Sequence, residues 1–310
     1  MEESRKLTVP EIIDYCKNQL GIKFELVSEE YVTEFLQKNN YFFRLKIYAE
    51  AWADSDKTKS GRYIGLDFGH LIELSTIDMF FRKLLLKMSI DFEHYLKVKL
   101  VNDCQNNPAD DGYKVVQAYF EAYPNVKKVL DSTIKLGDYS GTWNAKYSEH
   151  PAVWNLVEML NFHDFINFYS FYYDYLGQKC EYTKHFDSVR RLRNAAAHNV
   201  CMLCSFKPQQ HFHFDVETSF KLLQSNLGIS PSVITSSLKV PVLNDFAVML
   251  DVYTKLISSK KIKEKTLEEL CDFFDGRMIL HKDYFENCGD IKNAYKFGRA
   301  VLGLYIKDLK

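Results

Sequence analysis

The sequence predicts an all-α fold, and three observations support this class. Hydrophobic residues make up 46% of the 310 residues and aromatic residues 15%, enough for a substantial core. Only 7 prolines and 13 glycines occur, too few for the many turns of a β-rich fold. Apolar residues recur at helical spacing from Leu71 to about residue 104. We therefore expect a bundle of helices with little or no sheet.

The first 66 residues predict three helices and a loop. Thr8 and Glu11 form a capping box, and the helix that follows should end at Gly21. Ser28 should cap a second helix that reaches about Lys38. An aromatic helix should span residues 41–52, and the polar residues 54–65 read as a loop.

The longest periodic segment begins at Asp67. It predicts either one helix to about residue 104 or two helices separated by a kink. Asn106 to Pro108 predict a break. Beyond it we expect short helices at 110–122 and 125–136, a polar loop at 137–150, and helices at 153–161, 162–176 and 183–198.

The helical pattern weakens after His198. Residues 209–214 alternate like a short strand, or form a loop. We expect a turn-rich connector at 225–240 and helices at 216–226, 241–258, 266–275 and 290–308. The predicted organisation is an N-terminal helical region (1–66), a helical core (67–205) and a C-terminal helical extension (206–310).

Charge and cysteine content limit the classes of protein. The 40 basic and 41 acidic residues nearly cancel, so any nucleic-acid contact requires a local basic patch. The start of the chain has no apolar leader, and no stretch of about 18 uncharged apolar residues occurs. Seven scattered cysteines then fit reduced thiols and a cytoplasmic location.

One motif, RNAAAH at residues 193–198, places an arginine, an amide and a histidine within about one and a half helical turns. Asn194 and His198 share a helix face with Arg190, one turn earlier, and Arg191 adds charge nearby. Arginine forks onto phosphate and histidine titrates near neutral pH, a combination suited to phosphodiester chemistry. The alternative interpretation is a polar stripe that caps or salt-bridges its neighbours.

RNA carries its own nucleophile, the 2′-hydroxyl, so such a site would require no metal or cofactor. His198 would act as general acid or base, Arg193 would stabilise the transition-state charge, and Asn194 would orient the phosphate or the imidazole. Arg190 and Arg191 are candidate RNA contacts. Because one histidine cannot serve conveniently as base and acid together, we expect a homodimer with a composite site.

Two further patterns allow a functional and a structural interpretation. Cys201 and Cys204, with His211 and His213, supply zinc-ligand types, but the cysteines share a helix face with apolar residues, which favours buried thiols. The aromatic run at 162–175 favours a core or a dimer interface over base stacking.

Charged residues on two helices also allow two interpretations. Asp78–Arg82 and Glu93–Lys97 favour helix-surface ion pairs over a role in orienting the motif. A run of lysines favours a solvated helix end over RNA contact; its members are Lys260, Lys261, Lys263 and Lys265.

The motif on a helix of an all-α chain resembles the HEPN superfamily of ribonucleases. More of the chain, over about residues 10–205, resembles its Abi family of abortive-infection proteins (the AbiD/AbiF-like group). The resembling stretches are LQKNNYFFRL (36–45), residues 71–82 with Asp78 and Arg82, residues 93–97, HPAVW (150–154) with Val157 and Glu158, and LRNAAAHN (192–199).

This resemblance implies a HEPN-like helical bundle with additional N- and C-terminal helices. It implies a metal-independent endoribonuclease whose Arg193 and His198 work in a dimer, in phage defence or as a toxin controlled by a small non-coding RNA antitoxin. The rival interpretations are a non-catalytic RNA-binding or interaction module of the same fold and a metal-dependent phosphodiesterase. A scarcity of clustered His and Asp ligands argues against the second rival.

Overall fold

A computed structural model describes residues 6–307 apart from 53–56, 59, 134–138, 213–217, 219–220, 224 and 226. The described residues form helices, with two isolated β-bridges and no strand. The expected all-α class is confirmed.

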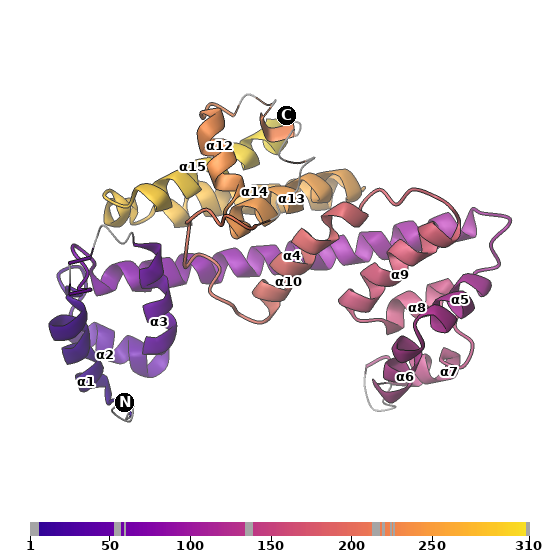
Figure 1. Ribbon diagram of the computed structural model, residues 1–310, viewed down its shortest axis with the longest axis horizontal. Helices are drawn as coiled ribbons and strands as arrows, with labels where there is room; N and C mark the ends of the chain where they lie inside the picture. The colour runs from indigo at the N-terminus through magenta and orange to yellow at the C-terminus, as the bar shows by residue number, and fades with distance from the viewer. Residues whose placement is uncertain are drawn as a thin grey trace.

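Helix α4 (Phe68–Gln105) is the axis of the molecule, and the other helices lie along it (Figure 1). The helices of the first 52 residues lie at one end of α4, and the helices from α5 (Lys114–Ala122) to α9 (Phe162–Tyr175) lie at the other end (Figure 1). The C-terminal helices cover one side, and α10 (Phe186–Ala197) packs against the middle of α4 and against α13 (Pro241–Leu256).

The N-terminal helices begin where their caps predict. The Thr8 backbone N–H donates to the Glu11 carboxylate at 2.8 Å, and α1 (Val9–Tyr15) continues as a π-helical turn, η1 (Cys16–Leu20). Gly21 ends it with a φ of 71°. The Ser28 hydroxyl caps α2 (Glu29–Lys38), and α3 (Phe42–Tyr48) continues into a 3₁₀ turn, η2 (Ala49–Ala51). The loop prediction for 54–65 falls partly outside the described residues.

The structure resolves whether the long periodic segment is one helix or two. Asp67 accepts a hydrogen bond from the Gly69 N–H at 2.8 Å, and α4 then runs without interruption for 38 residues. Its first three turns are buried on almost every side, because the N-terminal and C-terminal helices both pack there.

The region after α4 contains one helix more than expected. The stretch 137–150 is predicted as a loop, yet α7 (Gly141–Tyr147) lies within it. Trp143 and Tyr147, four residues apart, stack with ring centroids 6.1 Å apart, and α7 packs on α8 (Val153–Met159). A seven-residue helix is too short to show a hydrophobic period, so its contacts decide its structure. The remaining elements here are α5 (Lys114–Ala122), α6 (Pro124–Thr133), α8 (Val153–Met159), α9 (Phe162–Tyr175) and the 3₁₀ turn η4 (Thr183–His185).

The predicted connector at 225–240 is also wrong in part, because α12 (Pro231–Leu238) lies within it. The Ser230 hydroxyl caps this helix, Pro231 occupies its first turn, and Ile234 and Leu238 are buried. Because three of its eight residues are serines, the composition of this segment predicts a turn-rich connector and not a helix. The last elements are α13, α14 (Lys260–Asp275), η5 (Arg277–Ile279), η6 (Lys282–Phe285) and α15 (Gly289–Ile306).

Residues 209–212 form no strand, while residues 213 and 214 and most of the predicted 216–226 helix lie outside the described residues. Among the residues that are described, no single helix is long and apolar enough to cross a membrane. The pair α12 and α13 meets that criterion only together, and the two helices are bent by 100°.

The C-terminal helices join the core of the central helices. Phe81 of α4 packs edge-on against Phe246 of α13, with centroids 5.4 Å apart, and stacks on Phe273 of α14 at 5.8 Å. The aromatic run of α9 belongs to the core, one of its two expected places, since Phe165, Phe168, Tyr169 and Tyr172 are buried. The boundaries at 66 and 205 stay predictions.

Candidate nucleic-acid site at the end of helix α10

Helix α10 buries one face and exposes the motif. Val189, Leu192 and Ala196 pack into the core. Asn194 is half-buried and His198 is exposed at the C-terminal end of the helix, where its N–H donates to the Asn194 carbonyl at 2.9 Å. Asn194 and His198 therefore lie one turn apart on one face, as their spacing predicts.

The helix ends at Ala197, and His198 is its C-cap residue. Asn199 adopts a left-handed conformation with φ 57°, which is uncommon for any residue except glycine and is tolerated by asparagine. Its N–H donates to the Ala196 carbonyl at 3.2 Å, and the Val200 N–H donates to the Ala195 carbonyl at 2.9 Å. These two bonds form a Schellman motif, which fixes the path of the chain on leaving His198.

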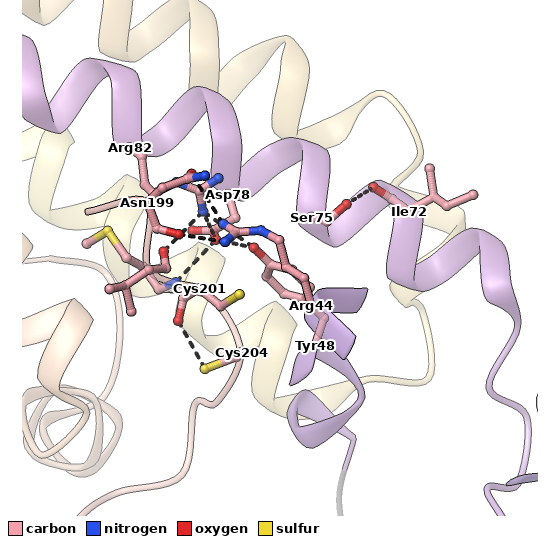
Figure 2. A network of polar contacts seen from close by, with 11 residues as sticks. Arg44, Tyr48, Ile72, Ser75, Asp78, Arg82, Asn199, Cys201 and Cys204 are labelled. Atoms are coloured by element: carbon pink, nitrogen blue, oxygen red, sulfur yellow. Dashed lines mark hydrogen bonds and ion pairs between the residues drawn. The ribbon is translucent and has the colours of Figure 1, made fainter. Parts of the chain in front are cut away.

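Four side chains from α3 and α4, which we call the clamp, hold the residues that follow (Figure 2). Arg44 donates to the Asn199 carbonyl at 2.6 Å and to its side-chain oxygen at 3.3 Å. Arg82 donates to the Val200 carbonyl at 3.2 Å, and Asp78 accepts from the Met202 N–H at 3.2 Å. Tyr48, the fourth member, donates to Asp78.

The Asp78–Arg82 pair was predicted as a helix-surface ion pair; the ion pair forms, but it is buried and does not lie on the surface. The Asp78 side chain is 0% exposed and the Arg82 side chain 6% exposed, with Arg82 donating to the carboxylate. Burial raises the pKa of Asp78 above its ordinary value, against the opposing effects of Tyr48 and Arg82. Arg82 contacts the chain two residues beyond His198, which supports its alternative role in orienting the motif.

The second predicted pair, Glu93–Lys97, forms at 3.2 Å, and its side chains are 23% and 16% exposed. The Lys97 ammonium lies 5.7 Å from the ring centre of Phe165 in α9. Lys97 of this pair therefore links α4 to α9.

Arg193 and Arg190 contact the start of α9. The Arg193 guanidinium lies 5.4 Å from the ring centre of Phe162, and its Nη1 donates to the Asn194 side-chain oxygen at 3.3 Å. Arg190 pairs with Asp187 at 2.9 Å, and its Nη1 lies 3.3 Å from Nδ1 of His163. Arg193 and Asn194 thus touch directly, and a second, exposed imidazole lies beside Arg190.

Arg191 is directed toward α13. It forms a two-pronged ion pair with Asp245 at 3.0 and 2.7 Å, and its guanidinium lies 5.2 Å from the ring centre of Phe212. Burial raises the pKa of Asp245 above its ordinary value. The structure does not bring Arg191 together with Arg190 and Arg193.

The cysteine pair lies just beyond the clamp. The Cys204 thiol donates to the Cys201 carbonyl at 3.1 Å, and burial raises the pKa of Cys204 to about 11. Among the described residues, no three His, Cys, Asp or Glu side chains are placed to hold a metal ion, and His213 lies outside them.

The predicted lysine run opens α14, where the Lys263 ammonium donates to the Thr254 carbonyl at 2.6 Å.

Reasoning from the motif missed three residues near it. Arg44 lies in the LQKNNYFFRL stretch, 155 residues before its partner Asn199. Phe162 and His163 begin α9 directly after its capping residue, Asn161. None of these three residues belongs to a periodic pattern that marks a site. Only the resemblance of residues 36–45 to a known family could have indicated Arg44.

The fold and the site together describe an all-α protein whose Arg-Asn-x₃-His motif ends a helix held by the clamp. Comparison with known proteins identifies the family. The family model described as Abi-like protein matches residues 34–203, more than half of the chain, and spans both the clamp and the motif. The chain therefore belongs to the Abi-like family, and this membership implies a role in phage defence by abortive infection. No curated protein and no solved structure gives a significant match.

Proposed function

We propose that the protein is a metal-independent endoribonuclease of the HEPN type that cuts RNA in abortive infection or as an RNA-controlled toxin. One observation carries the proposal: the clamp fixes the exposed His198 at the end of α10, one turn from the Arg193–Asn194 pair. A histidine beside a phosphate-binding arginine is the smallest set that this chemistry requires.

The proposed reaction is attack of the RNA 2′-hydroxyl oxygen on the neighbouring phosphorus. The new O2′–P bond forms as the P–O5′ bond breaks, leaving a 2′,3′-cyclic phosphate and a 5′-hydroxyl. His198 takes the 2′ proton or supplies the proton to the leaving oxygen. Arg193 stabilises the extra negative charge, and Asn194, 3.3 Å from it, holds the guanidinium toward the phosphate.

Because each chain supplies one His198, the proposal includes a homodimer in which two motifs face one RNA. Arg190 and His163 would contact the RNA beside the cleaved phosphate. Arg191 would add positive charge, reduced by its pairing with Asp245. A small non-coding RNA antitoxin is the proposed controlling partner.

The test is incubation of the purified chain with structured RNA in excess EDTA, followed by analysis of the fragment ends. His198→Ala and Arg193→Ala should abolish cleavage, while the control His94→Ala, which changes an exposed histidine on α4, should cut like wild type. Fragments should end in 2′,3′-cyclic phosphate. Retained RNA binding without cleavage by any variant would instead indicate the non-catalytic binding module.

A shared site makes a separate prediction for mixed subunits. Wild-type chains mixed with excess His198→Ala chains should lose more activity than dilution alone accounts for, because most dimers would contain one defective motif. Activity strictly proportional to the wild-type fraction would contradict the composite site and leave single-chain cleavage in place.

A further inference from the structure

A cavity of about 420 Å³ lies between α4 and the C-terminal helices, apart from the exposed face of α10. Its walls are apolar and include Ile77 and Phe81 of α4, Phe246 of α13 and Phe274 of α14. Protein cores are packed so closely that voids much larger than a water molecule are rare. A half-open apolar hollow of this volume is the size of a small-molecule binding site.

Three of the four charged residues that line the cavity are basic. Lys282 of η6 and Lys292 and Lys296 of α15 line it, with Glu286 as the single acidic residue. All four side chains belong to exposed residues, so they stand at its mouth. The Lys292 ammonium donates to the Glu286 carbonyl at 2.7 Å, which keeps that charge at the opening. Three ammonium groups against one carboxylate favour an anion there.

We propose that this cavity binds a small amphipathic anion. Its hydrocarbon chain or ring lies against the aromatic walls, and its carboxylate or phosphate lies among the three lysines. Burial of the apolar part supplies affinity, and the ammonium groups fix its direction. The binding itself does not depend on the proposed ribonuclease activity.

The cavity also touches the segment that follows the motif. Leu203 and Phe206 form part of its wall, and Met202, directly before them, is held by Asp78 of the clamp. Ile77, another wall residue, directly precedes Asp78 on α4. A molecule in the cavity therefore packs against residues 203–206, five to eight positions beyond His198. Amide hydrogen exchange in residues 199–206 should slow when the cavity is filled.

The experiment is calorimetric titration of the full chain with dodecanoate and with dodecyl phosphate, and with dodecanol as a neutral probe of equal chain length. Both anions should bind at least about tenfold more tightly than dodecanol. If only one of the two anions binds, the result supports the proposed site and shows which head group, carboxylate or phosphate, the lysines prefer. Equal affinity for dodecanol would overturn the anion preference.

Two variants test the location. Ala294→Phe places a ring in the cavity from a buried wall position and should remove binding. The surface change Lys282→Glu/Lys296→Glu should weaken binding of the anions about tenfold or more and leave dodecanol unaffected. Lys128→Glu, an exposed lysine on α6, should bind like wild type.

The proposal fails if neither anion binds, or if the charge-reversal variant binds them as wild type does. It also fails if exchange in residues 199–206 is unchanged at saturation, because the ligand would then lie elsewhere. Should Ala294→Phe not fold, the surface variant and the exchange measurement still decide. None of these experiments measures RNA cleavage. A negative result would therefore count against the proposed ligand and not against the proposed ribonuclease function.

Discussion

Replacing Arg82 with methionine should lower the free energy of unfolding by about 3–5 kcal/mol, the usual result of removing one partner of a buried ion pair. The Asp78 side chain is 0% exposed, so water cannot replace the lost guanidinium. Within the described part of the chain, its Oδ1 atom has no hydrogen-bond partner. Its Oδ2 atom accepts hydrogen bonds from Arg82, Tyr48 and the Met202 N–H.

The matched control is Lys97→Met on the same helix. Lys97 and Glu93 have the same four-residue spacing at 3.2 Å, but their side chains keep some contact with solvent. This change should reduce stability by about 1 kcal/mol or less. Urea unfolding followed by circular dichroism at 222 nm measures both variants. If Arg82→Met is no more harmful than Lys97→Met, the argument from burial is refuted.

A double variant and a pH series refine the test. Asp78→Leu/Arg82→Met removes both charges and should be more stable than Arg82→Met alone. Because the folded-state pKa of Asp78 is raised, its contribution is fully present below the ordinary value of 3.8 and is lost as pH rises through the folded-state pKa. The deficit of Arg82→Met should therefore grow as pH rises above 3.8, because loss of the guanidinium raises this pKa further, and a constant deficit would contradict the stranded carboxylate.

Three further predictions follow from local features. Asn199→Val should reduce stability by about 1–2 kcal/mol, since φ 57° strains a β-branched residue, whereas Asn199→Gly should change it little; equal effects in urea unfolding would contradict this. Burial lowers the pKa of His70 below its ordinary 6.5, and Nδ1 accepts from the Asp67 N–H at 2.9 Å. The stability it contributes is present above pH 6.5 and is lost as pH falls through the lowered pKa, so thermal melts should show a decline on acidification that is weaker in His70→Asn. Burial raises the pKa of Cys16 to about 12, so at pH 8 iodoacetamide should alkylate half-buried Cys180 long before Cys16, as mass spectrometry would show; similar rates would disprove its burial.

The fold was predictable wherever local chemistry decides it. Thr8, Ser28 and Asp67 begin helices because their side chains satisfy free backbone N–H groups or pair with a residue that does. The helix α7 was not predictable in this way, because seven residues cannot show a period and its stability comes from stacking and from α8. The same holds for α12, whose buried face appears only when α15 packs on it.

The sequence by itself determined that Asn194 and His198 lie on one face of a helix, because helical periodicity alone sets which side chains are neighbours. It also predicted Arg193 as a phosphate ligand, which stays a prediction. Only the tertiary structure decided that Asp78–Arg82 is buried while Glu93–Lys97 is partly solvated, since spacing along a helix is identical in the two cases. Burial depends on what packs from elsewhere in the chain, here Tyr48 and residues 199–202. No local pattern reports these contacts, which join residues 30 to 124 positions apart.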